Sequence, residues 1–297
     1  MSQLLKQLEK KSQVPGPVVW LTAGIHGDEP GGTAVVERLF KELGMVELIK
    51  GSLRALPLIN KSGAQKKIRE LPETGEDLNR LFPGQSNGTL GQKIAHQVWQ
   101  TIVETKSTLV LDLHNDWINS IPYILLDNDT DASLALASGL ITVREDVKTL
   151  PIERTLSGSL NKNGIPALTL ELGGAYVVDE KNVRIGVNAV SRILCQLGLI
   201  IQEIYLETKT FDAGVSLTSS AEMIGEKVFN YSDQPRPKTA GRIKMLVTPG
   251  QMIKKEDLIA EIEGGEKLFA ERDGILLGYT DQILSCPDQE IVACATI

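Results

Sequence analysis

The chain has 297 residues, of which 42% are hydrophobic and 23% are charged, so it is long enough to bury a core and to form two domains. Its formal charge is −7 without a Lys/Arg run, and only 4% of its residues are aromatic, which argues against a protein that binds nucleic acid or a membrane surface. The three cysteines form no C-x-x-C pair and no apolar signal segment is visible near Met1, so we expect a cytoplasmic location.

Segments typical of strands and of helices alternate between residues 18 and 206. The expected strands are Val18–Ile25, Leu53–Ile59, Thr108–Leu113, Tyr123–Leu126 and Ala167–Leu172. The expected helices are a segment that begins near Pro30 and ends near Gly44, then Gly91–Thr105, Ala132–Leu140 and Asn182–Tyr205. This alternation predicts an α/β domain with a mostly parallel or mixed sheet.

Three further segments have less regular patterns. Met1–Gln13 is polar and helix-like, and Ser157–Ser159 is interpreted as a turn. Lys61–Gly88 is long, polar and rich in turn residues, which is typical of a functional loop in a compact domain.

The composition changes near residue 208. From Ala221 onward the chain consists of short strand-like runs separated by the turns Pro249–Gly250, Gly264–Gly265 and Asp273–Gly274. We therefore predict two domains: residues 1–208 form the larger α/β domain, and residues 209–297 form a small all-β domain.

Two of the three histidines follow predicted strands and have carboxylates beside them. His26 and Glu29 lie on the turn after the first strand, and His114 lies at the end of the strand that begins at Thr108. Catalytic zinc sites use three protein ligands and leave one position for water, so His26, Glu29 and His114 are candidate ligands of one zinc ion. The alternative is that Asp28 or Glu29 only caps the following helix.

Two other carboxylates lie close to this predicted site. Asp112 lies two residues before His114 and so faces the same side of the strand, where it can accept a hydrogen bond from that histidine, or it can pair with a nearby loop. Glu171 lies towards the end of a buried strand, where a carboxylate is costly unless it is paired or functional. Near a metal-bound water it would be a general base, and otherwise an ion-paired or helix-capping residue.

The long loop carries candidate anion-binding residues. Asn79 and Arg80 together suit recognition of a substrate carboxylate, since arginine binds carboxylates through two parallel hydrogen bonds. Arg69 precedes them in the same loop, and for any single arginine the solvated surface position is the alternative. His96 is interpreted as a surface residue of a helix. No nucleotide-binding glycine motif or serine-hydrolase elbow is present.

Four of these stretches occur together and in order: Gly24–Glu29, Asp77–Gly84, Asp112–His114 and Gly164–Gly173. In this set the chain resembles the succinylglutamate desuccinylase/aspartoacylase family, which is related to the zinc carboxypeptidases. The resemblance implies a carboxypeptidase-like mixed sheet flanked by helices, and a C-terminal β domain similar to a barrel-sandwich.

The resemblance also implies roles for single residues. His26, Glu29 and His114 would hold one Zn²⁺, and Glu171 would be the general base. Asn79 and Arg80 would bind the substrate carboxylate. Arg69 matches an arginine that stabilises the oxyanion in this family.

The expected function is a zinc-dependent amidohydrolase that removes the acyl group from a small N-acyl amino acid. The alternatives are a zinc metallocarboxypeptidase and a non-catalytic protein that binds a metal or a ligand. The expected partner is a small molecule with a carboxylate, with no nucleic acid and no membrane. A homo-oligomer and a second metal ion, near Asp28 or Asp116, are left open.

Overall fold

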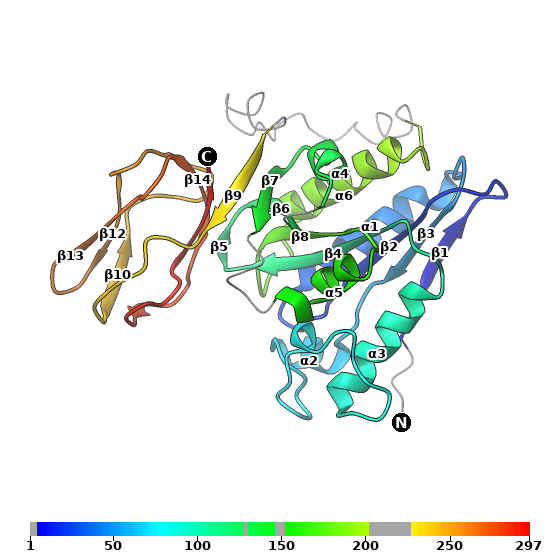
Figure 1. Cartoon of the computed structure of the whole chain (residues 1–297), viewed down its shortest axis with the longest axis horizontal. Helices are drawn as coiled ribbons and strands as arrows, with labels where there is room; N and C mark the ends of the chain where they lie inside the picture. The colour runs from blue at the N-terminus through cyan, green and yellow to red at the C-terminus, as the bar shows by residue number, and fades with distance from the viewer. Residues whose placement is uncertain (1–4, 128–129, 146–151, 202–226) are drawn as a thin grey trace.

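The computed structural model describes residues 5–127, 130–145, 152–201 and 227–297. Within these ranges the chain builds a sheet of 12 strands in the order β1-β3-β2-β4-β8-β6-β7-β9-β16-β14-β11, with β5 paired to β14 (Figure 1). The first eight strands are β1 (Leu8–Lys11), β2 (Val18–Ala23), β3 (Ser52–Leu56), β4 (Leu109–Asp116), β5 (Asn119–Ser120), β6 (Pro122–Asp127), β7 (Ile141–Glu145) and β8 (Ala167–Gly174). The sheet is mixed, as the sequence predicts.

Three central strands set the position of the site. β2, β4 and β8 are neighbours and run parallel, with Leu21 opposite Leu111 and Leu111 opposite Leu168. Their residues are apolar on both faces because helices cover both sides of the sheet. The carboxyl ends of the three strands therefore meet at one edge, where polar side chains from distant parts of the chain come together.

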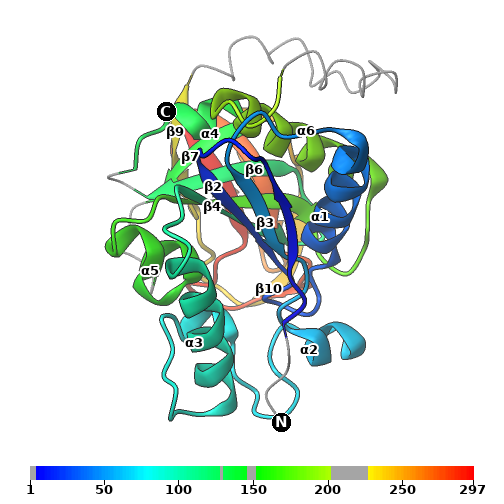
Figure 2. The same ribbon diagram turned by 90° about the vertical axis from the view of Figure 1, so that its right-hand side faces the viewer.

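Helices form a layer on each face of the sheet (Figure 2). The α-helices are α1 (Pro30–Glu42), α2 (Lys61–Lys66), α3 (Leu90–Val103), α4 (Ser133–Ala137), α5 (Leu156–Lys162) and α6 (Glu180–Gln196), and the 3-10 helices are η1 (Leu43–Met45), η2 (Leu78–Arg80) and η3 (Ile152–Arg154). One core cluster joins α1, α4 and α6 to the sheet, and a second joins α3 and α5 to its other face. None of the helices in the described ranges is long and apolar enough to span a membrane.

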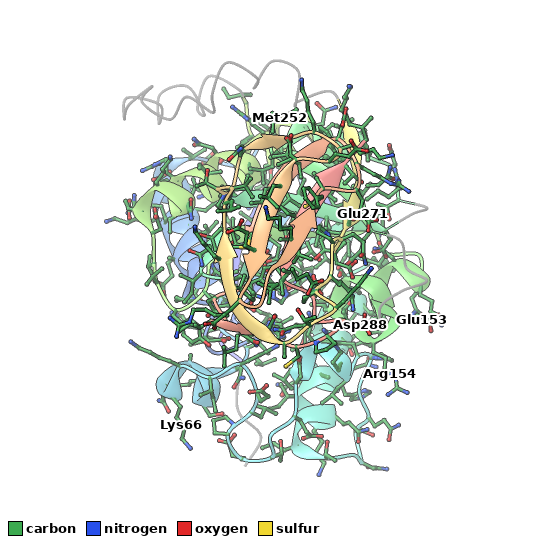
Figure 3. The ribbon with its side chains drawn as sticks, turned by 90° about the vertical axis from the view of Figure 1, so that its left-hand side faces the viewer. Lys66, Glu153, Arg154, Met252, Glu271 and Asp288 are labelled. Atoms are coloured by element: carbon green, nitrogen blue, oxygen red, sulfur yellow. The ribbon has the colours of Figure 1, made fainter. Side chains whose placement is uncertain are left out.

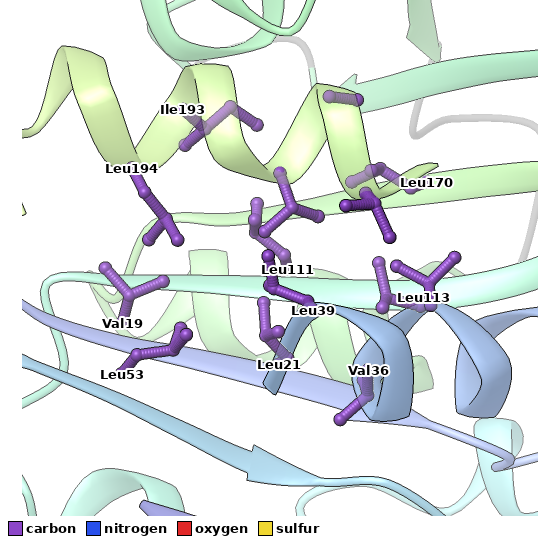
Figure 4. Packing of buried hydrophobic residues seen from close by; sticks show 14 of the residues in the cluster. Val19, Leu21, Val36, Leu39, Leu53, Leu111, Leu113, Leu170, Ile193 and Leu194 are labelled. Atoms are coloured by element: carbon purple, nitrogen blue, oxygen red, sulfur yellow. The ribbon is translucent and has the colours of Figure 1, made fainter. Parts of the chain in front are cut away.

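Leu111 lies at the centre of the first cluster and is 0% exposed (Figure 4). We expect Leu111→Ala to lower the free energy of unfolding by about 2–5 kcal/mol, because the change removes buried contacts and leaves a cavity. Urea denaturation followed by circular dichroism measures the loss. Leu246→Ala is the control, since Leu246 is 40% exposed. Equal shifts of the two midpoints would contradict this assignment of the core.

The C-terminal strands both extend the central sheet and form a second one. These strands are β9 (Val228–Ser232), β10 (Gly241–Met245), β11 (Met252–Ile253), β12 (Leu258–Ile262), β13 (Glu266–Phe269), β14 (Gly274–Tyr279), β15 (Leu284–Ser285) and β16 (Val292–Thr296). β9, β16, β14 and β11 continue the large sheet, while β13, β12, β10 and β15 form a separate sheet of 4 strands. A buried apolar cluster that includes Ile259, Leu276 and Val292 lies in this C-terminal segment. The all-β C-terminal segment agrees with the predicted fold class.

The predicted boundary between residues 208 and 209 lies outside the described residues, and the division into two domains stays a prediction. The pairing of β7 with β9 joins residues from both sides of that boundary in one sheet.

The structure corrects three of the local predictions. Residues 8–11 form β1 and not a helix, because they pair with β3 as the edge strand of the sheet and Glu9 forms an ion pair of 2.6 Å with Arg54. The segment Lys61–Gly88 is not a continuous loop but contains α2 and η2. Ser157–Ser159 belongs to α5, since the Thr155 side chain accepts a hydrogen bond from Gly158 N and starts a helix there.

The last predicted helix is shorter than expected. α6 ends at Gln196, and Gly198 follows with a positive φ of 72°. The predicted end at Tyr205 lies outside the described residues. The other predicted elements of the α/β part are present, with their ends shifted.

Candidate active site

The turn after β2 carries the first two residues of the site. Gly27 lies between His26 and Asp28, and a Cβ atom there would lie 2.1 Å from the backbone carbon of Gly63, so only glycine fits this close approach. Glu29 is the N-cap residue of α1, but its side chain makes no capping hydrogen bond. The capping interpretation of Glu29 is therefore wrong, and its carboxylate points to other partners.

Glu29 lies between the two histidines. His26 Nδ1 is 2.7 Å from Glu29 Oε1, and His114 Nδ1 is 2.8 Å from Glu29 Oε2. All three side chains are buried, with exposures of 2%, 4% and 3% for His26, Glu29 and His114. One candidate ligand atom from each residue lies within 4.8 Å of the others, so the structure brings together the three predicted ligands.

A carboxylate lies beside the outer nitrogen of each histidine. His26 Nε2 is 3.1 Å from Asp77 Oδ1, and His114 Nε2 is 3.0 Å from Asp112 Oδ2. The His26–Asp77 pair is a hydrogen bond, whereas the His114–Asp112 pair is a close contact without hydrogen-bond geometry. A proton on each Nε2 places it beside a carboxylate and leaves the lone pair of each Nδ1 directed at Glu29. Two lone pairs and a carboxylate that face one another repel unless a cation lies between them. This donor set fits a bound metal ion with carboxylate-supported histidine ligands.

Electrostatics supports the same conclusion. Burial raises the pKa of Glu29, but the neighbouring His26 and His114 outweigh it and hold the pKa well below its ordinary value. Burial lowers the pKa of His114, but Asp112 and Glu29 outweigh it and raise the pKa well above its ordinary value. The buried negative charge therefore needs positive charge beside it, which a proton or a metal ion can supply.

Asp112 lies beside His114, as strand alternation predicts. Its Oδ1 accepts a hydrogen bond of 2.7 Å from the hydroxyl of Thr22 on β2, which holds the carboxylate in place from the neighbouring strand. Asp77 lies beside the Nε2 of His26, as Asp112 lies beside that of His114. The sequence did not indicate this contact because Asp77 and His26 are 51 residues apart in the chain.

Glu171 on β8 lies directly opposite His114 on β4. Its Oε2 is buried and has no hydrogen-bond partner among the described residues. Burial raises the pKa of Glu171 well above its ordinary value, and Asp116 and Glu29 add to this effect. A carboxyl group beside the candidate metal position with a raised pKa is suited to accept and return a proton.

The predicted anion-binding residues line the same cavity. Arg69 Nη1 is 3.2 Å from Glu29 Oε1, and Arg69 Nε is 3.2 Å from Asp77 Oδ2, so Arg69 borders the candidate metal position. Asn79 is buried, and its Oδ1 accepts a hydrogen bond of 2.8 Å from Leu156 N. Arg80 donates to the Asn79 carbonyl oxygen and is otherwise exposed.

Asn115 is a buried residue that the sequence did not indicate. Its Oδ1 accepts from Gly31 N at the start of α1, and its Nδ2 donates to the carbonyl oxygens of Leu172, Gly173 and Gly174. Asn115 N also donates to Glu29 Oε2. One amide side chain thus connects the turn that carries Glu29 to the strand that carries Glu171.

The cavity at this site has a volume of about 310 Å³ and is lined from both parts of the chain. Glu145, Tyr231 and Glu290 line it from the side of β7, β9 and β16. A larger cavity of about 520 Å³ lies near the starts of β4 and β8, but it contains no histidine and none of the candidate site residues. His96 lies on α3 and does not line the site cavity.

Comparison with known proteins gives three kinds of match. The sequence model of the family described as "Succinylglutamate desuccinylase/Aspartoacylase catalytic domain" matches residues 15–197. A curated relative from Halomonas elongata, named N-alpha-acetyl-L-2,4-diaminobutyric acid deacetylase, is 27% identical over 282 residues, which cover 88% of this chain and 77% of the relative.

Two solved structures have the same fold. An aspartoacylase family protein from Mesorhizobium loti superposes with a TM-score of 0.76 at 19% identity, covering 98% of this chain and 88% of that chain. The product-bound ectoine utilization protein EutE (DoeB) from Ruegeria pomeroyi superposes with a TM-score of 0.74 at 19% identity, covering 99% of this chain and 89% of that chain. At these identities the structures show a shared fold.

Proposed function

Because the chain belongs to the succinylglutamate desuccinylase/aspartoacylase family, we propose that it is a zinc-dependent amidohydrolase that removes the acyl group from a small N-acyl amino acid. The observation that carries this proposal is the buried group of His26, Glu29 and His114, with Glu171 beside it in one cavity. The printed name of the relative from Halomonas elongata describes a deacetylase of an N-acetylated amino acid, which supports the same reaction class.

The residues have separate roles in this proposal. His26, Glu29 and His114 would hold one Zn²⁺, and Asp77 and Asp112 would hold the two histidines in the required tautomer. When bound, zinc supplies a Lewis acid that polarises the amide carbonyl and lowers the pKa of a water molecule towards neutrality.

Proton transfer is assigned to Glu171. Its carboxylate takes the proton of the attacking water and returns it to the amide nitrogen, so that the C–N bond breaks and the amine leaves neutral. The Arg69 guanidinium, which lies 3.2 Å from Glu29 Oε1, would stabilise negative charge that develops on the carbonyl oxygen. Asn79 and Arg80 would bind the carboxylate of the amino acid and fix the amide over Glu171.

We expect Arg80→Lys to raise KM by roughly 10- to 100-fold, because lysine cannot form the paired hydrogen bonds that a planar guanidinium gives to a carboxylate. kcat should change less, since the reacting atoms lie elsewhere in the cavity. Steady-state kinetics on the best substrate measures both constants. Arg154→Lys is the matched control, because Arg154 is an exposed arginine outside the cavity. The assignment is wrong if both variants keep the wild-type KM.

The proposed reaction is tested by screening zinc-loaded protein against N-acetyl, N-succinyl and N-formyl amino acids, with release of the free amine as the signal. Hydrolysis of at least one compound is expected. Cleavage of C-terminal residues from peptides, without any hydrolysis of acyl amino acids, would favour a carboxypeptidase. Zinc binding without hydrolysis of either class would favour a non-catalytic protein.

The three cysteines form no disulfide in the structure, which supports a cytoplasmic location as part of the proposal.

A further inference from the structure

A further cavity borders the turn that carries the first two candidate metal ligands. Its volume is about 380 Å³, and it shares only His26 and Glu29 with the active-site cavity. The rest of its lining comes from the same turn, the start of α1, the segment around α2 and the loop between β8 and α6. The two cavities therefore border one turn but are otherwise built from different parts of the chain. We call this one the turn cavity.

Asp28 is a buried carboxylate of the turn cavity, and the proposed reaction does not use it. It is 9% exposed, and it lines the turn cavity but not the active-site cavity. Its Oδ1 is buried and has no hydrogen-bond partner among the described residues. Because a buried carboxylate oxygen without a donor is costly, this atom indicates that a ligand supplies the donor.

Tyr176 is held beside Asp28 at the edge of the turn cavity. Its backbone N donates to the Asp28 carbonyl oxygen at 2.7 Å, and its φ of 66° lies in the left-handed region that a tyrosine rarely adopts. Burial raises the pKa of the Tyr176 hydroxyl and the Asp28 carboxylate adds to this effect, so the two side chains lie near each other. The Asp28 carboxylate is therefore directed to the side of the turn where Tyr176 lines the cavity.

The walls of the turn cavity are mainly apolar. Aliphatic and proline side chains from four segments supply this surface: Pro30, Ala34, Leu58, Ala64 and Val178. The ring of Tyr176 adds an aromatic face, which attracts cations. A mainly apolar cavity with a single buried polar group is typical of a binding site for a small molecule, whose orientation the polar group fixes.

The charge around the turn cavity is negative. Apart from the histidine and glutamate of the metal group, the charged residues that line it are Asp28, Glu37 and Lys67. Lys67 is exposed and does not bond Asp28 Oδ1. Asp281 and Glu70 also raise the pKa of the tyrosine at the edge, so further carboxylates lie near this part of the cavity. A cation is therefore favoured over an anion as the ligand.

We propose that the turn cavity is a second binding site, separate from the active site, for a small organic ammonium ion with an apolar body. The ammonium group donates to Asp28 Oδ1, and the apolar body packs against the aliphatic walls. This inference goes beyond the proposed hydrolysis and does not depend on it, because Asp28 has no part in the reaction.

The test uses n-butylammonium as the probe and n-butanol, which carries the same butyl group without the charge, as its neutral counterpart. NMR titrations of the zinc-loaded protein, observed on the probe, give both dissociation constants. The wild type should bind n-butylammonium at least about 10-fold more tightly, as expected for a hydrogen bond to a charged group. Asp28→Asn should lose this preference. Asp288→Asn, the same change at an exposed position in the C-terminal part of the chain (Figure 3), should keep it.

Two further variants locate the bound ion. Ala34→Leu narrows the turn cavity without changing its charge and should weaken binding of both probes, which also tests the site if Asp28→Asn does not fold. Glu145→Gln removes a carboxylate from the active-site cavity and should leave the affinity for n-butylammonium unchanged.

Three results would overturn the proposal. The first is equal affinity of the wild type for the two probes, and the second is unchanged affinity in Ala34→Leu. The third is a preference for n-butylammonium that is kept in Asp28→Asn, and its loss in Glu145→Gln would then place the ion in the active-site cavity.

Discussion

Glu171→Gln should lower kcat by roughly 10²- to 10⁴-fold, the range typical for removal of a general base. Glutamine has the same size and shape but does not accept the proton of the attacking water. No hydrogen bond joins the Glu171 side chain to the described residues, so the substitution breaks no contact of the fold. Metal content and the midpoint of thermal unfolding should therefore stay at wild-type values or rise slightly, and kcat alone should fall.

Glu104→Gln makes the same chemical change on an exposed residue at the end of α3 and should leave kcat unchanged. Elemental analysis of each variant is needed alongside the kinetics. If Glu171→Gln retains full kcat with normal metal content, Glu171 is not the base. If it loses metal along with activity, Glu171 acts at the metal position and the division of roles between it and Glu29 is wrong.

His114→Ala should remove bound metal and activity together. His114 contributes one of three candidate ligand atoms, and its loss leaves two ligands and a cavity at the end of β4. We expect affinity for Zn²⁺ to fall by about 100-fold or more. Asp112→Asn keeps the ligand and weakens only its orientation, so its affinity should fall by roughly 10- to 100-fold.

The chain contains a matched control for this experiment. Its third histidine, His96, lies on α3 outside the site cavity, and His96→Ala should bind metal as the wild type does. Competition with a chromophoric chelator gives the three affinities. Equal losses in His96→Ala and His114→Ala would show a general effect on the fold, and unchanged affinity in His114→Ala would remove this residue from the site.

The parts of the site that the sequence indicated share one physical property. His26 and Glu29, His114, and Glu171 each follow or end a run of apolar residues, and the three runs became the parallel strands β2, β4 and β8. Since carboxyl ends of parallel strands meet at one edge, position along the chain was enough to predict that these side chains lie together. Asp112 followed from strand alternation in the same way.

The parts that the sequence did not indicate depend on contacts between distant segments. Asp77 meets His26 only because the segment after α2 folds back over the turn at Gly27, where Gly27 N donates to the Arg69 carbonyl oxygen. Glu145 and Glu290 lie far apart in the sequence, and the pairing of β7, β9 and β16 brings both to the site cavity. No periodic pattern in the sequence specifies which of these strands are neighbours.

The local errors also have one origin. The polar composition of Leu8–Lys11 favours a helix in isolation, but pairing with β3 makes it a strand. The segment around Ser157 has the composition of a turn, but the Thr155 cap starts a helix there. Edge strands and short capped helices carry weak signals because few of their residues face the core. The long apolar strands were predictable because burial on both faces leaves little choice of residue.

The central claim is that one metal ion held by His26, Glu29 and His114 supports amide hydrolysis. The most direct measurement is a titration of metal-depleted protein with Zn²⁺, with hydrolysis of the best N-acyl amino acid as the signal and elemental analysis of each sample. Activity should be absent without metal, should rise in proportion to bound zinc, and should reach a plateau at one ion per chain. Full activity in protein that elemental analysis shows to be free of metal would contradict the account.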